Sequence, residues 1–103
     1  MSPREYKRYT EELKQNGYRF LQNQPYEGRC MWAKNPDEDI NSVIRIDIYH
    51  GFNAEGEEYY NVQPTIVLSR CDCECNVRLS INLLTTNIVD IESMFNKYVE
   101  KLK

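Results

Sequence analysis

The sequence predicts an α+β domain: an N-terminal helix, an antiparallel β-meander of four to five strands, and a C-terminal helix, with both helices packed on one face of the sheet. Apolar residues recur at helical spacing near both ends of the chain and alternate with polar residues in its middle. Short turn-like segments join the alternating runs, which favours strands that are neighbours in the sheet. At 103 residues the chain suffices for one core, so we expect a single domain over residues 1–103.

The two helices are predicted from their ends and from their apolar faces. Over residues 2–16, Ser2 suits the N-cap, Pro3 suits the first helical position, and Glu5 completes a capping box. Gly17 is well placed to end this helix. A Thr-Thr-Asn run precedes the second helix. Its residues at helical spacing are Ile88, Ile91, Met94, Phe95, Tyr98 and Leu102.

The middle of the chain is predicted to form strands. We expect them over residues 18–21, 28–33, 43–50, 59–69 and 76–83. Pro64 interrupts the fourth strand, and since proline has no N–H to donate, that strand should lie at a sheet edge there or be bulged. The last strand alternates most regularly, with Leu79 and Ile81 on the expected core face. Aligning the apolar faces of the last two strands places Leu68 opposite Leu79.

The four cysteines are the candidate metal ligands. They are Cys30, Cys71, Cys73 and Cys75. Four thiolates suit tetrahedral zinc, but a C-x-C-x-C run with one distant cysteine differs from the paired spacing of common structural zinc sites. Strand parity also predicts that Cys71 and Cys75 face opposite sides of the sheet. We therefore expect no cofactor, and a zinc-binding or redox cysteine cluster is the alternative.

The sequence favours a protein that is not an enzyme. His50 is the only histidine, and it shares the expected inner face of neighbouring strands with Cys30, so a nucleophilic pair is a conceivable arrangement. No cysteine-protease signature surrounds Cys30, and the chain contains no phosphate-binding loop or nucleophile-elbow motif. The neighbouring Glu57 and Glu58 point to opposite faces of a strand, which does not suit acid–base catalysis on one bond.

The charge is unevenly distributed along the chain. The net charge is −3, with +3 over residues 1–34, −7 over residues 35–75 and +1 over residues 76–103. An acidic centre favours a basic partner and argues against direct nucleic-acid binding. The basic residues of the first helix are interleaved with glutamates, so nucleic-acid binding through that helix is a second alternative. The chain shows neither a targeting signal nor an apolar run of membrane-spanning length, so we expect a cytoplasmic protein without membrane association.

A partner-binding surface is predicted where aromatic and acidic residues occur together. Its residues are Phe52, Glu55, Glu57, Glu58, Tyr59 and Tyr60, with the acidic turn at Asp37, Glu38 and Asp39. Aromatic anchors ringed by charge are typical of protein-contact patches. We predict a non-catalytic, acidic protein-binding module, an inhibitor or adaptor whose larger partner has a basic surface, such as a nucleic-acid enzyme. Phage-encoded inhibitors, anti-CRISPR proteins among them, and toxin-immunity proteins share this general profile.

Overall fold

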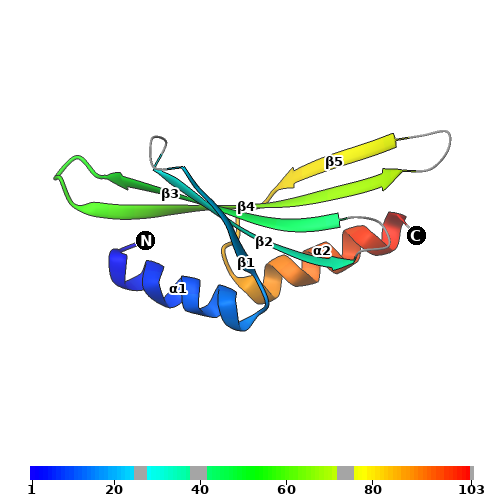
Figure 1. Cartoon of the computed structure of the whole chain (residues 1–103), viewed down its shortest axis with the longest axis horizontal. Coiled ribbons are helices and arrows are strands. Elements are labelled where there is room, and N and C mark those ends of the chain that lie inside the picture. The colour runs from blue at the N-terminus through cyan, green and yellow to red at the C-terminus, as the bar shows by residue number, and fades with distance from the viewer. Residues whose placement is uncertain (25–27, 38–41, 72–75, 103) are drawn as a thin grey trace.

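The fold is one antiparallel sheet with a helix before it and a helix after it (Figure 1). The computed structural model describes residues 1–24, 28–37, 42–71 and 76–102. The elements are α1 (Pro3–Gln15), β1 (Arg19–Gln24), β2 (Arg29–Asp37), β3 (Ser42–Phe52), β4 (Glu58–Cys71), β5 (Asn76–Asn82) and α2 (Ile88–Leu102). The strand order β1-β2-β3-β4-β5 confirms the predicted meander. The molecule is elongated, with extents of 52 × 26 × 21 Å.

Both helices begin where their capping residues predict. The Ser2 side chain accepts a hydrogen bond from the Glu5 backbone N–H at 3.2 Å, and the Glu5 carboxylate accepts one in return from the Ser2 N–H. Gly17 follows α1 with a φ of +85°, a left-handed conformation that glycine adopts without steric strain. At α2, the Asn87 side chain accepts from the Asp90 N–H at 3.1 Å. The caps thus satisfy N–H groups that a helix leaves unpaired at its first turn.

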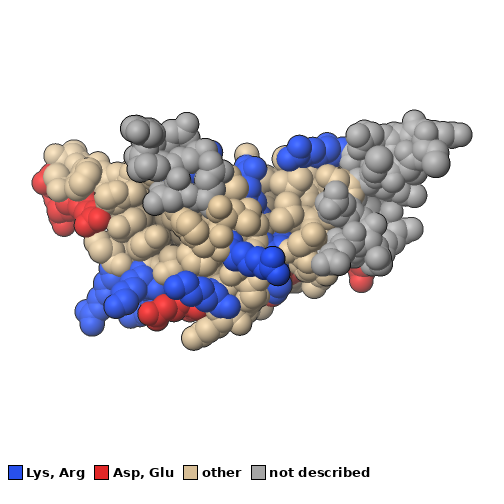
Figure 2. All heavy atoms as spheres, in the orientation of Figure 1, with Lys and Arg blue, Asp and Glu red and all other residues tan. Residues whose placement is uncertain are grey.

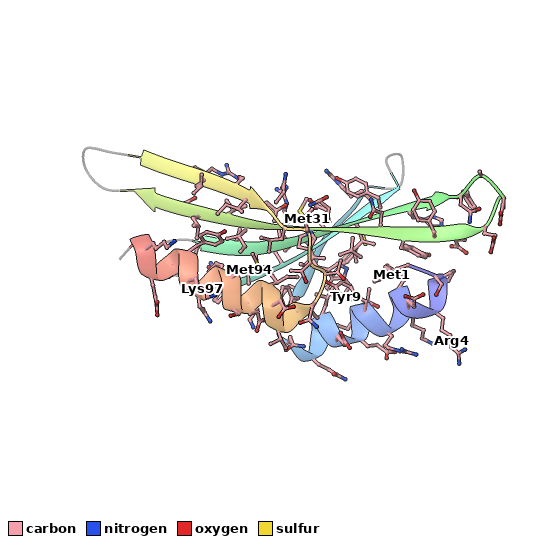
Figure 3. All side chains as sticks on the ribbon, turned by 180° about the vertical axis from the view of Figure 1, so that it is seen from behind. Met1, Arg4, Tyr9, Met31, Met94 and Lys97 are labelled. Atoms are coloured by element: carbon pink, nitrogen blue, oxygen red, sulfur yellow. The ribbon has the colours of Figure 1, made fainter. Side chains whose placement is uncertain are left out.

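The core lies between the helices and one face of the sheet. Figure 1 shows both helices below the sheet, and Figure 3 shows Tyr9 in the space between α1 and the strands. The core is formed by Tyr9, Leu13, Tyr18, Trp32, Ile44, Ile46, Ile48, Ile66, Leu68, Leu83, Ile88, Ile91, Phe95 and Val99. Each fully buried aliphatic or aromatic side chain contributes roughly 1.5–3 kcal/mol. The prediction that both helices pack on one face is confirmed.

The register explains how β4 accommodates a proline. Pairing of β3 with β4 runs without interruption, and Pro64 lies opposite Ile46. The ladder between β4 and β5 begins only at Thr65, so β4 is locally an edge strand at Pro64, where its carbonyl accepts from the Leu83 N–H at 3.0 Å. Of the two predicted solutions, the structure therefore uses the edge rather than the bulge. The predicted pairing of Leu68 with Leu79 is confirmed.

Two predictions about the strands were wrong. Leu79 shares the face of the buried Leu68, yet it is 49 % exposed. The reason is that β5 is the outermost strand, whereas both helices pack against β4. In addition, Asp37 was predicted to lie in an acidic turn, but it belongs to β2, where its backbone pairs with Ser42. Glu38 and Asp39, the other two residues of that turn, lie outside the described part of the chain.

Candidate functional site

The β3–β4 connection projects beyond the helices at one end of the molecule (Figure 1). We call residues 52–58 the hairpin tip. Figure 2 shows acidic side chains gathered at this end of the molecule. Glu55, Glu57 and Glu58 are all exposed there. The end of the sheet predicted to bind a partner is thus an exposed and negatively charged projection.

The backbone of the hairpin tip is held in one conformation by Asn53. Its side-chain oxygen accepts hydrogen bonds from the Glu55 N–H at 3.0 Å and the Glu57 N–H at 2.8 Å. Its backbone N–H donates to the Glu57 carbonyl, and its carbonyl accepts from the Gly56 N–H. Gly56 has a φ of +79°, which disfavours any side chain at that position. A loop ordered in this way loses little conformational entropy when a partner binds.

Two aromatic side chains are exposed at this end. Phe52 is 66 % exposed and Tyr59 is 40 % exposed. Phe52 lies beside the His50 ring, with the ring centroids 5.4 Å apart. Large apolar side chains in water next to carboxylates are the composition that the sequence predicted for a contact surface.

An aromatic ladder connects the hairpin to α1. We use this name for Tyr6, Tyr60, His50 and Phe52. The Tyr6 and Tyr60 rings stack with centroids 3.9 Å apart and planes 5° apart, and His50 stacks on Tyr60 at 4.8 Å. Each such aromatic pair contributes about 0.5–1.5 kcal/mol beyond its buried area. The base of the hairpin is therefore fixed to the helix rather than free to swing.

Glu58 is held at the base of the hairpin tip by two side chains. Its Oε1 is 2.8 Å from the His50 Nε2 and accepts a hydrogen bond from the Tyr60 hydroxyl at 3.0 Å. Burial, together with the hydrogen bond to Glu58, raises the pKa of Tyr60. One acidic side chain of the predicted site is thereby oriented, while 42 % of it remains exposed.

A hollow of about 320 Å³ lies between α1 and the strands at this end of the sheet. Its lining includes Tyr6, Gly28, Cys30 and His50. The Cys30 sulfur is 3.8 Å from the Tyr6 hydroxyl, and burial, then this contact, raises the pKa of Tyr6 to about 12. The His50 ring is hydrogen-bonded to Glu58 and the Cys30 sulfur contacts Tyr6, so the two candidate catalytic groups are oriented toward different neighbours. This arrangement differs from a nucleophile that is hydrogen-bonded to its base.

Gly28 is a residue of this hollow that the sequence did not single out. It pairs with the end of β3, where its carbonyl accepts from the His50 N–H. A Cβ at Gly28 would lie 2.8 Å from the His50 carbonyl oxygen, and the φ of +59° would strain any other residue. The close approach of β2 to His50 therefore requires glycine.

The register separates Cys30 from Cys71. Cys30 is aligned with Ile48 and hence with Val62 in β4, and Cys71 is nine residues beyond Val62. At about 3.3 Å per residue, this amounts to roughly 30 Å along the sheet. The two cysteines are therefore too far apart to bind one zinc ion in this chain. Cys73 and Cys75 lie outside the described residues, and a zinc site on the three clustered cysteines stays a prediction.

Asp37 and the three glutamates of the hairpin tip lie at opposite ends of β3, as expected if the acidity is divided between the two ends of the sheet. The backbone of Asp37 pairs with Ser42, at the end of β3 opposite the hairpin tip. Glu55, Glu57 and Glu58 lie at the other end. The contiguous part of the predicted site is therefore Phe52–Tyr60 alone.

The face of the sheet without helices carries charged residues whose grouping the sequence did not predict. On β3, Arg45 and Asp47 point to this face, because the isoleucines of the same strand point to the core. Asp47 is only 3 % exposed, and its Oδ2 lies 3.1 Å from the Arg45 Nε. Its Oδ1 is buried without a hydrogen-bond partner among the described residues. The alternation was visible in the sequence, but the burial of Asp47 was not.

No helix in the described part of the chain is long and apolar enough to cross a membrane. No group of three or more histidine, cysteine or acidic side chains suited to a metal ion occurs among the described residues. Comparisons with protein-family models, with curated proteins and with solved structures returned no significant match.

Proposed function

We propose that the protein is a non-catalytic binding module that presents its hairpin tip to a basic surface on a larger protein, which it inhibits or connects to other components. One observation carries this proposal. A conformationally fixed projection places the exposed Phe52 next to three glutamates at one end of an elongated molecule. No other described part of the chain combines these properties.

The hairpin tip offers two contributions to the binding free energy, one apolar from Phe52 and one electrostatic from the glutamates. Burying Phe52 in a partner pocket removes a large apolar side chain from water and is worth roughly 1.5–3 kcal/mol. The carboxylates of Glu55 and Glu57 attract a positively charged partner and orient it as it approaches. Phe52 is therefore expected to control the dissociation rate, and the glutamates to control the association rate.

The partner class follows from this charge. Enzymes that act on nucleic acids have positively charged substrate clefts, and a narrow acidic hairpin can enter such a cleft. A phage-encoded inhibitor, for instance an anti-CRISPR protein, or a toxin-immunity protein would act in this way. Support comes from the sign of the charge and from the shape of the tip.

The test is capture of partners from a lysate of the source cells, with identification of the retained proteins. A Glu55→Lys/Glu57→Lys variant is compared with the wild-type protein and with a Glu11→Lys/Glu12→Lys variant. The control makes the same change of charge on exposed residues of α1. We expect the first variant to lose a partner that the wild-type protein and the control retain.

Kinetics with the purified partner then separate the two contributions. The glutamate variant should lower the association rate constant, with a difference that shrinks as salt is added. Phe52→Ala should mainly raise the dissociation rate constant, by about tenfold or more. A partner set that is identical for all three proteins would contradict binding through the hairpin tip.

A further inference from the structure

The surface of greatest interest beyond the hairpin tip is the sheet face that neither helix covers. Figure 1 shows it as the upper side of the sheet, and Met31, labelled in Figure 3, lies on it opposite Tyr9. We call it the helix-free face. The register assigns its members, because directly paired residues point to the same side.

The helix-free face is positively charged although the chain as a whole is acidic. Its charged members among the described side chains are Arg19, Arg29, Arg45, Asp47 and Arg78. The single carboxylate, Asp47, is buried and is paired with the Nε of Arg45. Arg19 and Arg78 are exposed, on β1 and β5. With Arg45 paired to Asp47, the exposed Arg19 and Arg78 leave the described side chains of this face with a net positive charge, which favours anions.

The acidic hairpin tip is distant from Arg19, Arg45 and Arg78. Arg45 is aligned with Thr65 on β4, seven residues from Glu58. At about 3.3 Å per residue, they are roughly 23 Å apart, whereas the Debye length at physiological ionic strength is about 8 Å. The two ends of the sheet therefore present separate fields of opposite sign.

The same face carries exposed aromatic rings and a hollow. Tyr49 is 37 % exposed and Tyr59 is 40 % exposed, on neighbouring strands at diagonal positions. The Tyr59 ring lies over Gly51, where a Cβ would be 3.4 Å from the ring. A hollow of about 490 Å³ adjoins Arg19 and is lined by residues of both faces, Val43 on the helix-free face and Lys34 on the covered one. Tyr49 is aligned with Arg29 on the neighbouring β2. A flat ring beside an arginine is the combination that contacts unstacked bases and phosphates.

We propose that the helix-free face binds single-stranded nucleic acid. The arginines contact phosphates, and Tyr49 and Tyr59 stack on bases. A duplex is excluded as the main ligand, because its bases are already stacked on one another and are not available to the tyrosines. An acidic protein as ligand would contact the arginines but has no bases to stack on Tyr49 and Tyr59. Tyr59 also belongs to the Phe52–Tyr60 stretch, whereas Tyr49 and the arginines lie outside the hairpin tip, so the test of this function uses those residues.

The test is fluorescence anisotropy of a labelled single-stranded RNA of about 16 nucleotides and mixed sequence, the upper end of known site sizes for one small domain. The Arg19→Glu/Arg78→Glu variant should raise Kd by at least about tenfold. Loss of two phosphate contacts should also lower the slope of log K against log salt by about 1.4. Tyr49→Ala should raise Kd by about fivefold or more with an unchanged salt slope.

The matched control is Arg4→Glu/Arg8→Glu on α1. It reverses the same number of exposed arginines, and Figure 3 shows Arg4 pointing away from the sheet. The control should bind like the wild-type protein, and circular dichroism should show that every variant melts like the wild-type protein. If Arg19→Glu/Arg78→Glu unfolds, the Arg19→Gln/Arg78→Gln variant is measured in its place.

Four outcomes would overturn the proposal. The first is absence of saturable binding at low salt, and the second is loss of binding in the α1 control alone. The third is equal competition by duplex DNA or polyglutamate, together with no effect of Tyr49→Ala. The fourth is self-association that is abolished both by Glu55→Lys/Glu57→Lys and by Arg19→Glu/Arg78→Glu. The last would mean that the helix-free face receives the hairpin tip of a second copy. The first three outcomes do not bear on whether the hairpin tip binds a protein partner. The fourth, self-association, would bear on it.

Discussion

The two faces of β3 differ in chemistry although they alternate residue by residue along one strand. Ile44, Ile46 and Ile48 are at most 1 % exposed beneath the helices. Arg45 and Asp47 point the other way and form an ion pair on the uncovered side. One face therefore packs against the helices, and neither helix covers the other. Because consecutive residues of a strand point to opposite faces, the charge of a face differs from the charge of the sequence segment that contributes to it.

The largest effect expected from this comparison concerns the covered face. Phe95 on α2 is 1 % exposed in the core, so Phe95→Ala should lower the free energy of unfolding by about 3–5 kcal/mol. Val89, on the same helix, is 74 % exposed, and Val89→Ala should change that free energy by less than about 0.5 kcal/mol. Urea denaturation measures both values. Similar losses for the two variants would mean that α2 packs on the sheet through another side.

A smaller effect is expected on the helix-free face. Arg45→Met should lower the free energy of unfolding by about 1–3 kcal/mol, because it leaves the buried carboxylate of Asp47 without its cation. Asp47→Asn in the same background should recover part of the loss, since a neutral amide is cheaper to bury than an unpaired charge. The double-mutant cycle in urea measures the coupling. Additive effects would show that Asp47 does not depend on Arg45.

The smallest effect is a difference in alkaline stability on the covered side. The pKa of Tyr6 is about 12 in the folded state, whereas the pKa of a tyrosine in the unfolded chain is about 10. The folded state therefore binds more protons in this window, and stability falls as pH rises from about 10 to 12. Tyr6→Phe should make this fall shallower, as measured by urea denaturation across the window. Equal slopes for both proteins would indicate that Tyr6 ionises normally in the fold.

Much of the fold was predictable from local patterns. The Ser2–Glu5 capping box and Gly17 defined α1, and alternation on neighbouring strands was enough to place Leu68 opposite Leu79. Sequence patterns describe which side a residue faces, but not whether a helix covers it. Leu79 is exposed for that reason, since its strand lies beyond the helices.

The candidate sites were predictable only in part. Phe52–Tyr60 was identified because its aromatic and acidic residues are adjacent in the sequence, and they remain together at the hairpin. The arginines of the helix-free face come from different strands, so their grouping depends on register. The acidic residues around them in the sequence concealed it, and the sequence therefore argued against nucleic-acid binding. Gly28 was equally hidden, because its role depends on the His50 carbonyl across the ladder.

The most direct test of the central claim, that the hairpin tip and the helix-free face are separate binding surfaces, is to measure both ligands with both variants. Glu55→Lys/Glu57→Lys should lose the protein partner and bind single-stranded RNA at least as tightly as the wild-type protein. Arg19→Glu/Arg78→Glu should lose the RNA and keep the protein partner. If both variants lose the same ligand and keep the other, the two regions form one site and the claim is contradicted.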